Sequence, residues 1–111
     1  PERQEIINRI EEEHIHGVVF LTGDRHCTDM SRIELEGGAV IHDLTVSPLT
    51  SSAYDNSDEP NDLRIEGTTV PFRNFAELNF SGPRKNRSLE IVVKDVNGVE
   101  VWTEILIAKE L

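Results

Sequence analysis

The sequence is poor in three features that would each have pointed to a class of protein. A single cysteine, Cys27, excludes an internal disulfide. No apolar run approaches the ~20 residues of a transmembrane helix, so no membrane span is predicted. Only 11 basic residues stand against 21 acidic ones, and the net charge of −10 argues against a nucleic-acid or anionic-membrane partner, because both bind basic patches. No signal peptide opens the sequence, and we expect any export signal to lie upstream of Pro1.

The first part of the chain predicts a helix followed by a strand. A length of 111 residues predicts one domain or one piece of a larger domain. Residues 1–14 read as a helix, because Ile6, Ile7 and Ile10 form one apolar stripe. Residues 18–21 are continuously apolar, which indicates a short strand buried on both faces. Ligands collect beyond the carboxyl ends of such strands, and residues 22–26 occupy that position here.

The remainder of the sequence predicts β-structure. Residues 31–35 and 39–46 are strand candidates separated by a Gly-Gly turn, and alternating apolar residues predict another strand over 76–80. Residues 47–71 read as a long loop, which in a compact chain is usually functional or disordered. The predicted fold class is therefore α+β: an N-terminal helix and a buried strand, followed by a mostly antiparallel β-sheet.

A β-hairpin is predicted around the Asp-Val-Asn-Gly segment at 95–98. A two-residue Asn-Gly turn is one option. A three-residue loop with a glycine bulge is favoured, because it segregates apolar from charged residues. Its expected apolar face joins Leu89, Ile91 and Val93 to Val99, Val101, Ile105 and Ile107.

The turn after the first strand carries the residues most suited to chemistry. Asp24 offers a carboxylate oxygen and His26 an imidazole nitrogen, a pair that suits Fe, Mn or Zn better than Ca alone. Gly23 lets the backbone fold so that both side chains could reach one site. Arg25 could bind phosphate oxygens as a fork or could face solvent. Asp29 could orient the loop as a supporting partner or could simply begin the next strand.

The other reactive residue types are interpreted structurally. His14 and His16 suit a helix C-terminus, and His42 suits a hydrogen-bonded position in a strand. Cys27 is expected to be a buried thiol. No neighbouring base is evident for the loop hydroxyls, so a serine nucleophile is not expected; these hydroxyls are Ser47, Thr50 and Ser51.

Several of these segments together resemble the PhoD-like metallophosphatases. The segment Val-Val-Phe-Leu-Thr-Gly-Asp-Arg-His (18–26) resembles the family's last metal-binding loop. The segment His-Asp-Leu-Thr-Val-Ser-Pro-Leu-Thr-Ser (42–51) resembles its following strand and hydroxyl-rich loop. Arg73-Asn74-Phe75 and the hairpin over 95–102 are similar to its C-terminal pattern, so the resemblance runs over residues 1–111.

The resemblance implies a partial β-sandwich flanked by helices, with two or more metal ions at the strand ends. His26 falls on a metal-binding histidine of the family, and Asp24 takes the place of another. The implied metals are Fe, Mn, Zn or Ca, and the implied reaction is attack of a metal-bound hydroxide on a phosphate ester. The parent of such a chain is expected to be extracytoplasmic, either periplasmic or secreted.

One departure from the family is large. The family's upstream Asp, Asp-x-x-Asp and Asn-His segments, which supply most metal ligands, are absent from these 111 residues. The chain is therefore expected to be one partial domain, inactive alone, whose partner is the upstream half of the same domain. A homodimer is a further expectation, because a missing half leaves strand edges exposed. The alternatives are a non-catalytic β-rich interaction module and a family member that has lost activity.

Overall fold

The computed structural model describes residues 2–53, 55, 62–108 and 111. Over these residues it contains α1 (Glu2–Glu12), β1 (Val18–Thr22), β2 (Asp29–Glu34), β3 (Val40–Thr45), β4 (Asn74–Ser81), β5 (Ser88–Asp95) and β6 (Glu100–Ile107). The strands form two three-stranded sheets, in the orders β1-β3-β2 and β4-β5-β6. All paired strands are antiparallel except β1 and β3. The predicted α+β class with mostly antiparallel sheet is confirmed.

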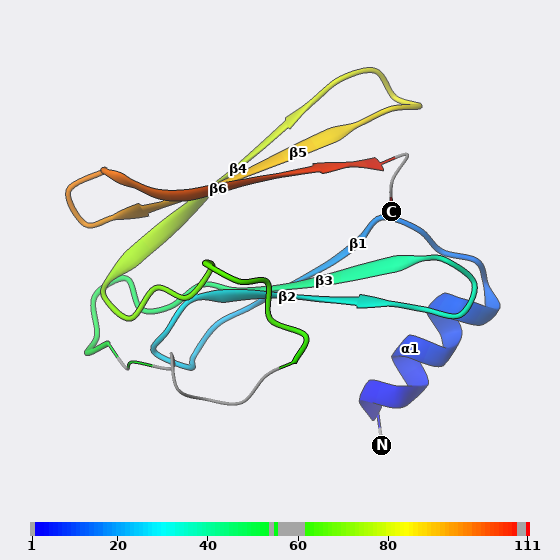
Figure 1. Ribbon diagram of the computed structural model, residues 1–111, viewed down its shortest axis with the longest axis horizontal. Helices are drawn as coiled ribbons and strands as arrows, with labels where there is room; N and C mark the ends of the chain where they lie inside the picture. The colour runs from blue at the N-terminus through cyan, green and yellow to red at the C-terminus, as the bar shows by residue number, and fades with distance from the viewer. Residues whose placement is uncertain (1, 54, 56–61, 109–110) are drawn as a thin grey trace.

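The molecule has three layers, with the two sheets stacked and α1 against the outer side of the β1-β3-β2 sheet (Figure 1). The main core lies between the sheets and is formed by Met30, Leu44, Val70, Ile91, Val93 and Leu106. A second core lies between α1 and the sheet and is formed by Ile7, Ile10, Leu35, Ala39 and Ile41. Both cores use apolar residues at helical or alternating spacing, as the fold requires.

The helix agrees with its sequence pattern and ends two residues earlier than expected. Ile7 and Ile10 are buried against the sheet, whereas Ile6 lies at the margin and is half exposed. The helix ends where His14 takes a φ of 52° and Gly17 a φ of 74°, because a left-handed residue cannot continue a right-handed helix. No helix in the described part of the chain is long and apolar enough to cross a membrane.

The prediction that the first strand is buried on both faces is wrong. β1 is an edge strand that pairs with β3, and Leu21 is 61% exposed. The central position belongs to β3, where five of the six residues are buried. β1 is therefore apolar although one of its edges is unpaired among the described residues and part of one face is exposed to solvent.

Part of the predicted 47–71 loop pairs with β2. Thr28 and Val70 exchange backbone hydrogen bonds of 3.2 and 2.8 Å, and the amide of Ile65 donates to the carbonyl of Met30 at 2.8 Å. Residues 54 and 56–61 of this segment lie outside the described residues. Residues 64–70 therefore run beside β2 as an irregular segment that makes isolated β-bridges.

The hairpin between β5 and β6 has the predicted three-residue loop. The amide of Asp95 donates to the carbonyl of Val99 at 2.9 Å, and Gly98 takes a φ of 80°. The Asp95 carboxylate accepts hydrogen bonds from the amides of Asn97 and Val99 at 2.9 and 3.0 Å. Positive φ is the conformation for which glycine is suited, so the turn chemistry agrees with the sequence.

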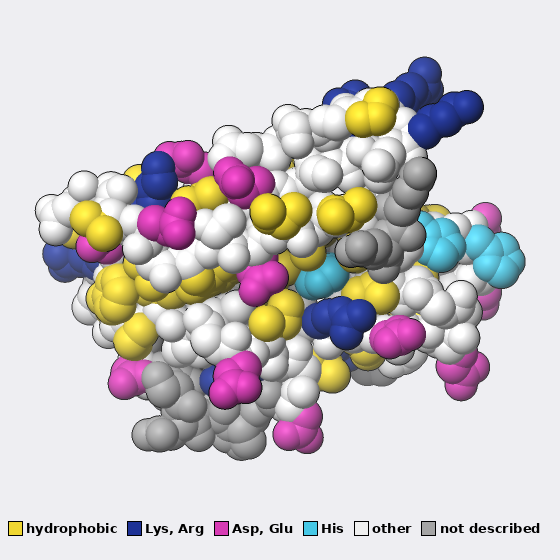
Figure 2. Space-filling model, turned by 45° about the horizontal axis from the view of Figure 1, so that its top comes forward, with side chains coloured by type: hydrophobic (Ala, Val, Ile, Leu, Met, Phe, Trp, Pro, Cys, Tyr) yellow, Lys and Arg dark blue, Asp and Glu magenta, His cyan; other side chains and the backbone are white. Residues whose placement is uncertain are grey.

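The predicted apolar face of the hairpin is wrong, because β6 contains a bulge beyond the turn. Lys94 faces Glu100 but Val93 faces Trp102, which leaves Val101 as the extra residue. A one-residue shift moves every later side chain to the opposite face. The core therefore takes Trp102 and Leu106 from β6, while Val99, Val101 and Ile105 are exposed. Figure 2 shows exposed hydrophobic side chains intermixed with charged ones on this side of the molecule.

Candidate functional site

The Gly-Asp-Arg-His turn leaves the carboxyl end of β1 and crosses the end of β3. The amide of Val46 donates to the carbonyl of Thr22 at 3.0 Å, which continues the parallel pairing to the start of the turn. Asp24 and His26 then take φ values of 67° and 61°. Left-handed φ is uncommon outside glycine, although aspartate and histidine tolerate it better than most residues. The turn therefore has a specific backbone shape that surrounding contacts must maintain.

His26 is held against the loop that follows β3. Its amide donates to the hydroxyl of Ser47 at 3.2 Å. The hydroxyl of Ser51 lies 3.4 Å from each of the two ring nitrogens, a long and weakly directional contact. The side chain is half-buried, whereas Asp24 is exposed. Of the two predicted metal ligands, His26 is thus the one that other segments hold in position.

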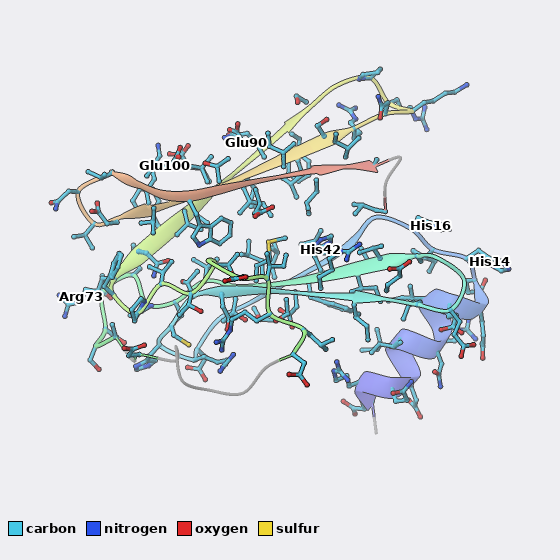
Figure 3. The ribbon with its side chains drawn as sticks, in the orientation of Figure 1. His14, His16, His42, Arg73, Glu90 and Glu100 are labelled. Atoms are coloured by element: carbon cyan, nitrogen blue, oxygen red, sulfur yellow. The ribbon has the colours of Figure 1, made fainter. Side chains whose placement is uncertain are left out.

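A third segment reaches the same corner from the start of β4. The Nε of Arg73 donates to the carbonyl of Ser51 at 2.9 Å. Figure 3 shows Arg73 at the end of the two sheets, opposite to His14 and His16. Residues 24–26, 47–51 and 73–74 are distant in sequence, and the fold brings them together. We refer to Asp24, His26, Ser47, Ser51 and Arg73 as the His26 corner.

A buried hydrogen-bond network fixes these segments to one another. The hydroxyl of Thr28 lies 2.7 Å from Oδ1 of Asn74 and accepts a hydrogen bond from the amide of Ser47 at 3.0 Å. The amide of Asn74 donates to the carbonyl of Pro48 at 2.9 Å, and its side-chain Nδ2 donates to the carbonyl of Phe72 at 2.7 Å. Thr28 and Asn74 are almost completely buried, at 0% and 1% exposed. The corner is therefore anchored to the interior.

Arg25 and Asp29 lie on a different side of the sheet. Asp29 is buried and accepts a hydrogen bond of 3.0 Å from Nε of Arg64, and a terminal nitrogen of Arg25 is 3.8 Å from the same carboxylate oxygen. Both Arg25 and Asp29 line a cavity of about 530 Å³ beneath α1. Asp29 and Arg25 therefore form a long ion pair beside this cavity. Both residues remain predictions as substrate-binding and supporting groups.

The cavity beneath α1 has a polar end. The hydroxyl of Thr22 donates to the carboxylate of Asp43 at 3.1 Å and lies 2.9 Å from the hydroxyl of Thr45. These residues face the same side as Phe20 because they alternate along β1 and β3 in parallel register. The cavity is formed because α1 covers the apolar half of the sheet's outer face and leaves this polar half open.

The described residues do not complete a metal centre. Among them, no group of three or more His, Cys, Asp or Glu side chains is arranged to hold a metal ion. Cys27 is fully buried, as expected, and His14 and His16 lie at the other end of the molecule (Figure 3). Asp24 and His26 supply only two side chains, too few for the four ligands that Zn requires or the six to eight that Ca requires. The residues present therefore fit only part of a coordination sphere.

His42 is buried between the sheets. Desolvation and then the positive charge of Arg32 lower its pKa. Its Nδ1 has no hydrogen-bond partner among the described residues, which differs from the hydrogen-bonded position expected for it. This histidine is part of the interior and does not reach the His26 corner.

Three residues of the corner have no binding role among the sequence-based predictions. Ser47 and Ser51 are hydroxyls for which no nucleophilic role is expected, and Arg73 belongs only to a family-like segment. The sequence contains eleven basic residues, and nothing in it indicates that Arg73 is the one that bonds the loop beside His26.

Comparison of the chain with models of known protein families, with curated proteins and with solved structures gives no match.

Proposed function

We propose that this chain supplies the last metal-binding loop of a metal-dependent phosphoesterase, in which a metal-bound hydroxide would hydrolyse phosphate mono- or diesters. His26 and Asp24 are the proposed metal ligands, and the metal would be Fe, Mn, Zn or Ca. The metal would supply both the activated nucleophile and a positive centre for the phosphate. The chain as it stands is proposed to be inactive, because two donors cannot hold a dinuclear centre.

The observation that carries this proposal is the convergence of three separate segments at the His26 corner. The turn at 23–26, the loop at 47–51 and the segment at 73–74 are the same three that resemble the PhoD-like family. They meet through contacts to Ser47, Ser51 and Asn74. A plain connection between strands would not need a left-handed histidine that is held by a second loop, which is itself bonded by Arg73 and Asn74.

The remaining ligands are proposed to come from another segment that docks where the sandwich is open. β1 and β4 are both edge strands, and between them lie two cavities of about 300 and 190 Å³. Their walls are mostly apolar and include Leu21 and Phe80, which are 61% and 70% exposed. Exposed apolar side chains beside a strand edge favour addition of a further strand. In this proposal the upstream half of the same domain occupies the open edge. Where that half is absent, a second copy of the chain would occupy it.

The same open edge supports the second candidate, a non-catalytic β-rich interaction module. In that case the apolar cleft binds another polypeptide and the His26 corner is only a structural junction. The two candidates differ in whether His26 binds a metal ion. Metal binding is therefore the property to measure first.

The first experiment compares His26→Ala with His14→Ala in the polypeptide that contains this chain together with its proposed upstream half. Both histidines have left-handed φ values, 61° and 52°, so the backbone effect of alanine is matched. Thermal midpoints are measured with and without Mn²⁺ and Zn²⁺, since an ion that binds the native state raises the midpoint. We expect the wild type and His14→Ala to respond to the ions, and His26→Ala to lose the response.

Hydrolysis is then measured on the polypeptide that contains both this chain and its upstream segment. A bis-aryl phosphate is supplied with Mn, Fe or Ca, and His26→Ala is expected to abolish turnover. Equal responses of both histidine variants to metal, together with turnover unchanged by His26→Ala, favour the interaction module. Turnover by the 111-residue chain alone would contradict the proposed need for the upstream half.

A further inference from the structure

The His26 corner contains one exposed arginine whose hydrogen-bonding capacity is mostly unused. Arg73 makes a hydrogen bond through Nε to the carbonyl of Ser51, at 2.9 Å. Its two terminal nitrogens make no hydrogen bond to any residue that the structure describes. The guanidinium therefore offers four N–H donors toward solvent beside Ser51, out of the five that the group carries.

The arginine projects from a fixed piece of backbone. Asn74, the next residue, is buried and is held by hydrogen bonds to Pro48, Phe72 and Thr28. The Nε bond to Ser51 restrains the guanidinium plane as well. Holding a flexible side chain in advance lowers the entropic cost of binding a ligand.

The position of Ser51 connects this arginine to His26. Its carbonyl accepts from Arg73, and its hydroxyl lies 3.4 Å from the imidazole ring of His26. A tetrahedral oxyanion beside Ser51 could therefore meet the guanidinium on one side and the imidazole on the other. Guanidinium presents two parallel N–H groups, which match a pair of phosphate oxygens.

We propose that Arg73 and the hydroxyl of Ser51 form an oxyanion subsite that holds the phosphate group of the substrate next to His26. The ligand class is a phosphate monoester or diester, and inorganic phosphate is the minimal ligand. The identity of the substrate rests on the proposed function, whereas phosphate binding by Arg73 does not. In a chain with a net charge of −10, such local donors are required for an anion to bind.

Arg25 is the competing candidate and serves as the internal control. It is 44% exposed in its side chain, lies 3.8 Å from the carboxylate of Asp29 and lines the cavity beneath α1. The same carboxylate is bound by Arg64. An arginine drawn toward a buried carboxylate on that side is less suited to a phosphate at the His26 corner than Arg73.

The test is a titration of the metal-free, ¹⁵N-labelled 111-residue chain with inorganic phosphate at constant ionic strength. The Nε–H signals of the arginines and the backbone amide of Ser51 are followed by NMR. We expect saturable shifts at Arg73 and Ser51. Arg73→Gln is expected to weaken phosphate binding about tenfold or more, because it removes the charge-assisted hydrogen bonds. Arg25→Gln is expected to change the affinity by less than about twofold.

Three results would overturn the subsite: no saturable shift in the folded wild type, unchanged affinity in Arg73→Gln, or loss of binding in Arg25→Gln instead. The amide signals of Thr28 and Asn74 report whether the corner remains folded. If Arg73→Gln disturbs them, Arg73→Lys is decisive, because it retains the charge but loses the fork. A phosphate affinity of Arg73→Lys equal to that of the wild type would count against the subsite, whereas a lower affinity would support it.

The subsite and the proposed function fail separately. Phosphate binding through Arg73 without hydrolysis under any metal condition would leave the subsite and remove the phosphoesterase. Metal-dependent hydrolysis that is insensitive to Arg73→Gln would leave the phosphoesterase and remove the subsite.

Discussion

The buried hydroxyl of Thr28 offers the sharpest test of how the His26 corner is held together. It accepts a hydrogen bond from the amide of Ser47 at 3.0 Å and lies 2.7 Å from Oδ1 of Asn74. Thr28→Val replaces the hydroxyl by a methyl group of nearly the same shape. The substitution therefore removes two hydrogen bonds without opening a cavity.

The expected loss of stability comes from the two buried polar groups that lose their hydrogen-bond partner. The Ser47 amide loses the hydroxyl as its acceptor, and Oδ1 of Asn74 loses its donor, in an environment where Asn74 is 1% exposed. Leaving a buried polar group without a partner costs about 1–3 kcal/mol. With partial relaxation of the loop, we expect the free energy of unfolding to fall by about 3 kcal/mol. That is a large share of the ~5–15 kcal/mol typical of a domain.

The matched control is Thr103→Val. The hydroxyl of Thr103 is buried but has no hydrogen-bond partner among the described residues. Its removal leaves no new unpaired group, so we expect a change within about 1 kcal/mol, in the stabilising direction. Both variants are measured by urea unfolding at pH 7.5, with the free energy obtained by linear extrapolation.

The difference between the two valine variants decides the question. If Thr28→Val destabilises the chain no more than Thr103→Val, the Thr28–Ser47–Asn74 network does not hold the corner. The structural account of how three segments meet at His26 would then be wrong.

Three further predictions concern charge, pH and backbone conformation. Asp29→Asn should lower the free energy of unfolding by about 3 kcal/mol, because it leaves the mostly buried Arg64 without its counter-charge; urea unfolding measures this. His42 has a pKa below its ordinary value of 6.5, so its effect on stability is absent well above pH 6.5, becomes destabilising as the pH falls below 6.5, and is complete once the pH is below the folded pKa. The stability difference between pH 7.5 and 5.5 should therefore be smaller in His42→Gln than in the wild type. Gly82→Ala should destabilise more than Gly98→Ala in thermal unfolding: both have positive φ, but a Cβ at Gly82 would lie 2.6 Å from a backbone carbonyl oxygen, whereas the space at Gly98 is open.

Each of these predictions has an outcome that contradicts it. Asp29→Asn with unchanged stability would mean that the Arg64 charge is solvated despite its burial. An unaltered pH dependence in His42→Gln would assign the titration to other groups. Equal effects at the two glycines would mean that the chain relaxes around the Gly82 contact.

Local sequence patterns were sufficient for most of the secondary structure. The helix, the strands around the Gly-Gly turn and the three-residue hairpin loop follow from apolar spacing and from glycine's freedom to take positive φ. These signals act over a few residues, so no distant contact is needed to read them. The prediction that Asp24 and His26 are metal ligands likewise rests on residue type and on their order along the chain.

Patterns within one segment could not decide how segments meet. The apolar run of β1 is compatible with a central or an edge strand, and only the pairing with β3 made it an edge. The alternation in β6 does not reveal that Val101 is an extra residue, which reversed the expected core face. Both errors arise because strand position and register depend on a partner strand.

Local patterns and composition predict the fold class, the turn that carries Asp24 and His26, and the acidic character of the chain. The folded chain places Arg73 and His26 on either side of Ser51, and it places Arg25 beside Asp29. The contacts of Arg73 with Ser51 and of Ser51 with His26 join residues 22 and 25 positions apart, so they depend on how the segments pack. A linear pattern of residue types does not contain that packing.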